Sequence, residues 1–339
     1  MGEVALPRVG YLGPAGTFSE EALQASARPG SYEPVAIATI YDTVSAVREG
    51  AVRWAVVPIE NSLDGSVTVT LDLLAETGMH AEGACPPASA KEHGDLEIVG
   101  EALLAVRHAL VAAGPLALGE IDTVLSHPQV PGQCTRLLRG ELAHARVLPA
   151  SSTAEAVRTV SSSGVRGQAA LGTRLAAEIY GGTVIRDGVQ DRDDNVTRFV
   201  WLARAKAEGP DVPPLAAPGA PPQAAPDAPP VAAPDVPVAA PGAPPLGARD
   251  GEGWKTSVVF WGPGADSPGW LVSCLSEFAR REINLTKIES RPRRATLGHY
   301  MFFVDLDGSA REPAVAEAVE GLRGACEHVR VLGSYPAAR

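Results

Sequence analysis

A proline-rich segment in the second half of the chain sets the strongest limit on how the sequence can fold. From 208 to 247 the residues are almost all Ala, Pro, Gly, Val and Asp, and 14 of the chain's 30 prolines fall within it. Proline has no backbone N–H for a sheet ladder and clashes inside a helix, so we predict an extended spacer. We therefore expect domains at 1–204 and 253–339, joined by a linker at 205–252, in a chain long enough for two cores.

The composition argues against several classes of function. A net charge of −11 and a pI near 5.2 argue against nucleic acid as a partner, because binding phosphates needs clustered Lys and Arg. No run of about 18 apolar residues is present to span a membrane, and residues 1–8 do not resemble a secretory signal, so we expect a cytoplasmic protein. The four cysteines form no CxxC pair and the seven histidines no HxxxH or HxH pair, so neither disulfides nor a metal site is expected.

The region after the linker is predicted to alternate strands and helices in the order β-α-β-β-α-β. Apolar residues recur at helical spacing in 269–281 and 312–326. Strands are predicted at 255–261, 283–290, 299–306 and 328–335. This order is typical of a ferredoxin-like fold, in which helices cover one face of the sheet. The region shows no catalytic constellation, so we expect it to bind a ligand or to assemble.

The region before the linker alternates short apolar strands with helices, which predicts an α/β domain with a largely parallel sheet. Three segments, 17–20, 126–129 and 152–155, each follow a strand and match the pattern of a helix capping box. Helix N-termini at the carboxyl ends of strands attract anions, and together they would suit a ligand with more than one carboxylate. For any single segment, capping alone is a sufficient explanation.

Two further segments place polar groups at the ends of apolar strands. In VVPIENSLDGSV, a buried strand is expected at 55–57 and runs into Pro58, and Glu60 and Asn61 follow it. In GVQDRDDNVTRFVWLA, Thr197 and Arg198 stand where a polar run becomes an apolar strand. These groups are either turn formers and a snorkelling arginine, or parts of a pocket for a small anion. The chain has no GxGxxG and no GxxxxGK[ST] motif, which argues against a dinucleotide cofactor and a phosphate-binding loop.

Seven segments together resemble the prephenate dehydratases of phenylalanine biosynthesis. Five precede the linker: GYLGPAGTFSEEA, VVPIENSLDGSVTVTLDLL, SHPQVPGQC, SSTAEAV and QDRDDNVTRF. Two follow it, INLTKIESRP and DSPGWLV, and resemble an ACT domain. The resemblance covers nearly all of the chain outside the linker. It implies a catalytic domain of two α/β lobes, like a type II periplasmic binding protein, with prephenate in the cleft between them. It also implies a homodimer or homotetramer that L-phenylalanine inhibits, with no cofactor.

The resemblance also implies roles for individual residues. Thr197 is expected to assist the departing hydroxyl, and Arg198 to hold a carboxylate with its planar guanidinium. The other expected catalytic residues are Glu60 and Asn61, and the expected substrate-binding residues are Ser126, Gln133, Thr17, Ser152 and Thr153. The expected effector-binding residues of the ACT domain are Gly269, Leu271, Val272, Glu289, Ser290 and Arg291.

The chain departs from the family pattern in two places. Trp270 stands where family members have a small residue, so its indole is expected to fill or reshape the effector pocket. Residues 79–95 form an insertion, expected to be a surface loop or to overhang the cleft.

Three alternatives to a prephenate dehydratase bear on the function. Relatives that decarboxylate prephenate without aromatising it lack the Thr-Arg-Phe motif, which this chain keeps at 197–199. A binding protein or sensor without turnover is disfavoured by the complete set of polar residues. Between prephenate and arogenate as the preferred substrate the sequence leaves the choice open.

Overall fold

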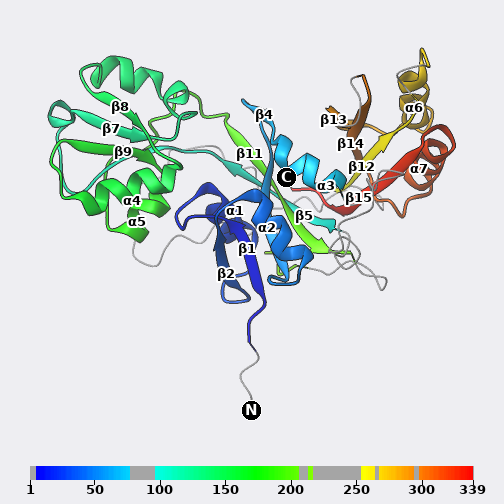
Figure 1. Ribbon diagram of the computed structural model, residues 1–339, viewed down its shortest axis with the longest axis horizontal. Helices are drawn as coiled ribbons and strands as arrows, with labels where there is room; N and C mark the ends of the chain where they lie inside the picture. The colour runs from blue at the N-terminus through cyan, green and yellow to red at the C-terminus, as the bar shows by residue number, and fades with distance from the viewer. Residues whose placement is uncertain are drawn as a thin grey trace, which may run out of the picture. The chain divides into compact units, whose positions relative to one another are not determined.

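The structure is a computed structural model that describes residues 5–76, 96–205, 213–216, 253–263, 267–293 and 298–338. It contains two compact units, Met1–Leu215 and Ala216–Arg339. The expected insertion at 79–95 and most of the expected linker lie outside the described residues. The first unit consists of two lobes, each built on its own sheet (Figure 1).

The sheet of the first lobe has the strand order β2-β1-β3-β11-β5, with the short β4 paired to β3. Its strands are β1 (Arg8–Leu12), β2 (Glu33–Ile37), β3 (Trp54–Asn61), β4 (Gly65–Ser66), β5 (Leu96–Ala105) and β11 (Val196–Arg204). Its helices are α1 (Phe18–Ser26), α2 (Ile40–Arg48) and α3 (Thr68–Glu76). Leu23 of α1 packs with Trp54, Phe199 and Trp201 in a buried apolar cluster on one face. That packing fixes β11 in the middle of the sheet.

The second lobe has the strand order β10-β6-β9-β7-β8. Its strands are β6 (Ala109–Ala112), β7 (Thr123–Ser126), β8 (Arg146–Pro149), β9 (Gln168–Gly172) and β10 (Thr183–Arg186), and its helices are α4 (Thr153–Ser163) and α5 (Arg174–Tyr180). The chain enters this lobe between β5 and β6 and returns between β10 and β11. Two covalent connections therefore join the lobes.

The expectation of a largely parallel sheet is wrong, because both sheets are mixed. β1 is parallel to β2 and β3, and β7 is parallel to β8 and β9. β11 is antiparallel to both β3 and β5, and β6 is antiparallel to β9 and β10. The cause is the return of the chain from the second lobe, which brings β11 into the first sheet in the opposite direction to its neighbours.

The strand expected at 55–57 extends through Pro58 to Asn61. Its register against β11 shifts where Arg198 pairs with Glu60 and Phe199 pairs with Pro58. A residue without a backbone N–H is tolerated at such a β-bulge, since the ladder is already interrupted there. The bulge leaves Glu60 and Asn61 paired with the start of β11.

Two of the three expected helix caps are present. Thr17 caps α1 and Ser152 caps α4, since their hydroxyls accept the backbone N–H groups of Glu20 and Glu155 at 3.4 and 3.0 Å. The cap expected after Ser126 is wrong. A turn is followed there by a 3-10 turn, Pro131–Gln133, and a short π-helical segment, Leu137–Glu141. Pro131 would clash with the carbonyl four residues earlier, which prevents an α-helix from starting at 127.

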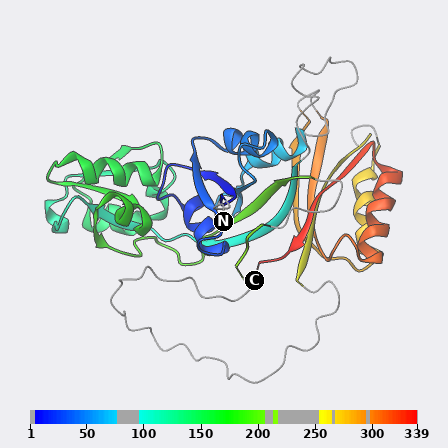
Figure 2. The same ribbon diagram turned by 90° about the horizontal axis from the view of Figure 1, so that it is seen from below.

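The second unit contains the expected β-α-β-β-α-β order in a four-stranded antiparallel sheet, β13-β14-β12-β15. Its elements are β12 (Trp254–Trp261), α6 (Trp270–Ala279), β13 (Leu285–Pro292), β14 (Tyr300–Asp307), α7 (Pro313–Ala325) and β15 (His328–Pro336). Both helices cover the same face of the sheet (Figure 2), where Phe260, Phe278, Val304 and Leu322 form the core. In the described part of the chain, no helix combines the length and the apolar character needed to cross a membrane.

Candidate active site

Side-chain hydrogen bonds run from the first lobe to the second, beginning at the end of β3. Asn61 Oδ1 accepts the backbone N–H groups of Leu63 and Asp64 at 2.9 and 3.0 Å. Because a backbone N–H only donates, this contact identifies the oxygen of the amide and places Nδ2 on the other side. There Asn61 Nδ2 donates to Thr197 Oγ1 at 2.9 Å and to Asn195 Oδ1 at 2.7 Å. Asn61 is thereby fixed as a donor to the hydroxyl of Thr197.

The same hydrogen bonds continue to Gln133, which belongs to the second lobe. Since Asn195 Oδ1 accepts from Asn61, Asn195 Nδ2 is the donor to Gln133 Oε1 at 3.0 Å. His108 Nε2 lies 3.0 Å from that same oxygen, and Gln133 Nε2 lies 3.4 Å from Asp64 Oδ2. We call the connected set the junction network; it comprises Asn61, Asp64, His108, Gln133, Asn195 and Thr197.

The two connections between the lobes are hydrogen-bonded to each other beside this network. Val106 N donates to Asn195 O at 2.8 Å, and Val189 N donates to His108 O at 2.9 Å. His108 N donates to the side-chain oxygen of Gln190 at 3.0 Å. The backbone of His108 is therefore held at both its N–H and its carbonyl.

Thr197 is placed to donate a hydrogen bond. Its oxygen already accepts an N–H from Asn61, so the hydroxyl hydrogen is directed elsewhere. If that hydrogen moves toward an acceptor, the N–H of Asn61 stabilises the negative charge that develops on Oγ1. The pair can thus assist the departure of an oxygen leaving group.

Arg198 and Glu60 lie on the opposite face of the sheet from Thr197 and Asn61. The register pairs Thr197 with Asn61 and Arg198 with Glu60, and successive residues of a strand point to opposite faces. The Arg198 side chain is 8% exposed, and its Nε donates to Oε2 of the fully buried Glu101 at 2.6 Å. Its Nη1 lies 3.5 Å from Glu60 Oε2. The four residues expected to be catalytic therefore form two separate groups.

Gln133 is the expected substrate-binding residue that belongs to the junction network. The hydroxyls of Thr17 and Ser126 donate to backbone carbonyls, those of Leu12 at 2.8 Å and His127 at 3.2 Å. Ser152 caps α4, and Thr153 is buried as the first residue of that helix. Helix and turn formation alone is therefore sufficient to explain the hydrogen bonds and the burial of these four residues.

Sequence reasoning missed His108, Asn195 and Glu101. Asn195 lies in a run of acids and amides that gave no separate signal, whereas Glu101 gave a usable signal as a carboxylate in the middle of an apolar strand. Burial lowers the pKa of His108 below its usual value, and its contact with Gln133 offsets only part of that effect. The imidazole is therefore neutral near pH 7. Among the described residues, no group of three His, Cys, Asp or Glu side chains is arranged to hold a metal ion.

A cavity of about 300 Å³ lies at the N-terminus of α6 in the second unit. Gly269, Leu271 and Val272, all expected to bind an effector, line it together with Ser267, His299 and Tyr300. Gly269 is the N-cap of α6 with a φ of +84°, a conformation that glycine adopts without strain. The remaining expected effector residues, Glu289, Ser290 and Arg291, lie on β13 and are not part of the lining.

The indole of Trp270 forms a wall of this cavity. Its Nε1 donates to the carbonyl oxygen of Ala325 at the end of α7 at 2.7 Å. Its ring lies 6.2 and 6.0 Å from the rings of Phe260 and Phe302. The ring packs against Gly262, where an added Cβ would lie 2.7 Å from Cζ2 of the indole. Trp270 therefore forms part of the wall of this cavity.

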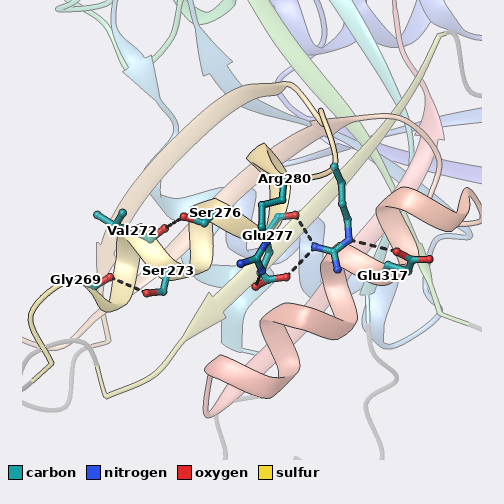
Figure 3. A network of polar contacts seen from close by, with 8 residues as sticks. Gly269, Val272, Ser273, Ser276, Glu277, Arg280 and Glu317 are labelled. Carbon is teal, nitrogen blue, oxygen red and sulfur yellow. Dashed lines mark hydrogen bonds and ion pairs between the residues drawn. The ribbon is translucent and has the colours of Figure 1, made fainter.

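Polar contacts lie at both ends of α6 (Figure 3). Ser273 and Ser276 donate to the carbonyls of Gly269 and Val272 at 3.2 and 2.7 Å. Further along, Arg281 bridges Glu277 of α6 and Glu317 of α7 at 2.8 and 3.5 Å.

Comparisons with known proteins match both units. The family model for prephenate dehydratase matches residues 9–207. A curated prephenate dehydratase of Mycobacterium sp. (strain KMS) is 37% identical over 341 residues, covering 98% of this chain and 89% of the relative. The solved prephenate dehydratase of Arthrobacter aurescens, in complex with L-Phe, is 32% identical with a TM-score of 0.72, covering 98% of this chain and 90% of that one. GqqA, described as a novel type of quorum quenching acylase, is 26% identical with a TM-score of 0.72, covering 98% of both chains.

Proposed function

The chain belongs to the prephenate dehydratase family, and we propose that the family reaction takes place at the junction network between its two lobes. That reaction converts prephenate to phenylpyruvate, carbon dioxide and water, a step of phenylalanine biosynthesis. The ring carboxylate leaves as CO2, its bonding electrons enter the ring, and the C4 hydroxyl leaves as hydroxide that takes up a proton. Because the ring becomes aromatic, the protein needs only to orient a dianion and to assist a poor leaving group.

Thr197 is proposed to assist the departing hydroxyl, and the hydrogen bond from Asn61 to its oxygen is the observation that carries this role. A threonine hydroxyl is too weak an acid to give up its proton unaided, so we assign it hydrogen-bond donation. Gln133, whose oxygen is engaged, offers its N–H groups to a carboxylate or keto oxygen of the substrate. Both residues then present donors to an anion.

Arg198 and Glu60 are proposed to act from the other face of the sheet. The ion pairs of Arg198 with Glu101 and with Glu60 hold the start of β11 against β5 and β3, and so position Thr197. The expectation that Arg198 binds a substrate carboxylate remains a competing prediction. Substrate-binding roles for Ser126, Thr17, Ser152 and Thr153 likewise remain predictions.

The second unit is proposed to be an ACT domain that binds L-phenylalanine in the cavity at the N-terminus of α6. The cavity combines apolar walls with a helix N-terminus, which suits the side chain and the carboxylate of an aromatic amino acid. We propose a homodimer or homotetramer in which the β13 residues Glu289, Ser290 and Arg291 complete the site. The proposed domains are 1–204 and 253–339 with a linker at 205–252, in a cytoplasmic protein.

The first prediction is that the purified protein converts prephenate to phenylpyruvate without added metal. The product is measured by its ultraviolet absorbance in alkali and identified by mass spectrometry, with EDTA-treated protein as the control. Arogenate is assayed in parallel, since phenylalanine would be the product in that case. Turnover of an acylated substrate in place of prephenate, as the description of GqqA would suggest, would contradict the proposal.

A second prediction concerns the effector cavity. Gly262→Ala is expected to raise the concentration of L-phenylalanine needed for half-inhibition about tenfold, because the new Cβ displaces the Trp270 indole. Gly324→Ala in α7 is the matched control, since a Cβ there meets no atom within 4 Å. The response of both variants is measured by inhibition assays and by calorimetric titration of L-phenylalanine. An unchanged response in Gly262→Ala would place the effector elsewhere.

A further inference from the structure

The donor and acceptor atoms of each amide in the junction network can be assigned in turn, starting from Asn61. The two backbone N–H groups at Asn61 fix its oxygen, Asn61 then fixes the oxygen of Asn195, and Asn195 presents its Nδ2 to Gln133. The atom of Gln133 that receives this donor must be Oε1. Since His108 Nε2 contacts the same oxygen at 3.0 Å, it must carry a hydrogen. His108 is therefore the neutral tautomer with its proton on Nε2.

The other ring nitrogen of His108 supports this assignment. Only 1% of the residue is exposed, and within the described part of the chain its Nδ1 has no hydrogen-bond partner. A proton on Nδ1 would be a buried donor without an acceptor, which costs more than an unpaired lone pair next to apolar atoms. Phe18 meets the imidazole edge to face, with ring centroids 5.4 Å apart. The ring is thus held in place with one nitrogen used and the other left unpaired.

We propose that His108 is a positioning residue that determines which end of the Gln133 amide faces the substrate. With His108 and Asn195 both donating to Oε1, the amide cannot rotate by half a turn without bringing donors against donors. Its Nε2 is therefore turned outward, and its contact with Asp64 Oδ2 at 3.4 Å is too long to hold it strongly. An anionic substrate then meets N–H groups in place of an oxygen. This inference rests on the proposed function, which puts the substrate at the junction network.

The experiment compares two substitutions that keep different atoms of the imidazole. His108→Gln carries an amide N–H near the position of Nε2, whereas His108→Asn reaches only as far as Nδ1. We expect His108→Asn to lower kcat/KM about tenfold, the loss typical of one buried hydrogen bond. His108→Gln should stay within about threefold of the wild type. Equal losses in both variants would overturn the proposal, since the Nε2 donor would then not be what matters.

A double-mutant cycle tests whether His108 acts through Gln133. In a Gln133→Ala background, His108→Asn is expected to cause no further loss of kcat/KM, because the amide that it positions is absent. The same tenfold loss in both backgrounds would overturn the proposal. Thermal unfolding of each variant separates lost folding from lost positioning.

The tautomer gives a test that needs no variant and no substrate. Nitrogen-15 chemical shifts of the wild-type protein at pH 7 should show a protonated Nε2 and an unprotonated Nδ1 for His108. A proton on Nδ1, or on both nitrogens, would overturn the proposal. Absence of prephenate turnover in the wild type, with the expected tautomer present, would instead remove the proposed function.

Discussion

Replacement of Thr197 by valine is expected to lower kcat by about a thousandfold, a loss of the size seen when one transition-state donor is removed. Valine keeps the branched shape that suits β11 but has no hydroxyl to donate to the departing oxygen. Because the hydrogen bond strengthens only as the C–O bond breaks, the affinity for prephenate should change little. Single-turnover kinetics together with titration of the substrate measure the two effects separately.

Thr197→Ser is the control for this experiment. Serine keeps the hydroxyl within reach of Asn61 and loses only a methyl group, so kcat should stay within about tenfold of the wild type. If Thr197→Val retained wild-type turnover, the leaving group would have to be assisted by another donor. A Thr197→Val variant with weakened binding and unchanged kcat would make Thr197 a substrate-binding residue only.

The pairing of Thr197 with Asn61 shows how far the sequence can predict a site. Each residue lies at the polar end of an apolar strand, which is enough to place both at the ends of strands in a sheet. The hydrogen bond between them depends on β11 entering the sheet beside β3, and the local pattern carries no information on that neighbour. The sequence could therefore predict that Thr197 and Asn61 lie at strand ends, and it could not predict the hydrogen bond between them.

Arg198 shows the opposite case. Its chemistry suggests a carboxylate partner, and the structure gives it one, but that partner is Glu101 of β5. The alternation of a strand places Arg198 and Thr197 on opposite faces, so two adjacent motif residues cannot both face one side of the sheet. That rule can be applied to the sequence alone. The position of Glu101 opposite β11 could not be read from it, since strand order is set by tertiary packing.

The same limit explains the outcome for the fold. The two helices of the second unit could be predicted because each buries one face and repeats at a helical period, and its strands β12 and β14 because each contains a short apolar run. The strand directions of the first unit could not be predicted. The chain leaves the first lobe and later returns to it, so β11 runs antiparallel to β3 and β5, whereas successive βαβ units would make it parallel. His108 was missed for a related reason, since a lone histidine before an apolar strand acquires its partner only when Gln133 arrives from the second lobe.

Glu101→Ala is expected to lower the free energy of unfolding by about 3–5 kcal/mol, because it removes the buried carboxylate that Arg198 Nε contacts at 2.6 Å. Urea denaturation followed by circular dichroism measures this change. The matched control is Glu141→Gln, which removes the partner of Arg186 on the protein surface and should leave stability nearly unchanged. A small loss for Glu101→Ala would mean that water or another group satisfies Arg198.

The double variant Glu101→Leu with Arg198→Met then separates the two roles proposed for Arg198. Two apolar side chains of similar volume should recover most of the lost stability, since a buried ion pair often contributes no more than well-packed apolar residues. If Arg198 only holds β11 in place, the recovered protein should also recover most of its kcat/KM for prephenate. If Arg198 binds a substrate carboxylate, stability returns while KM stays raised at least about tenfold, the cost of a lost charged contact. Recovered stability with a raised KM would therefore show that Arg198 binds the substrate, and the positioning role would then belong to Glu101 alone.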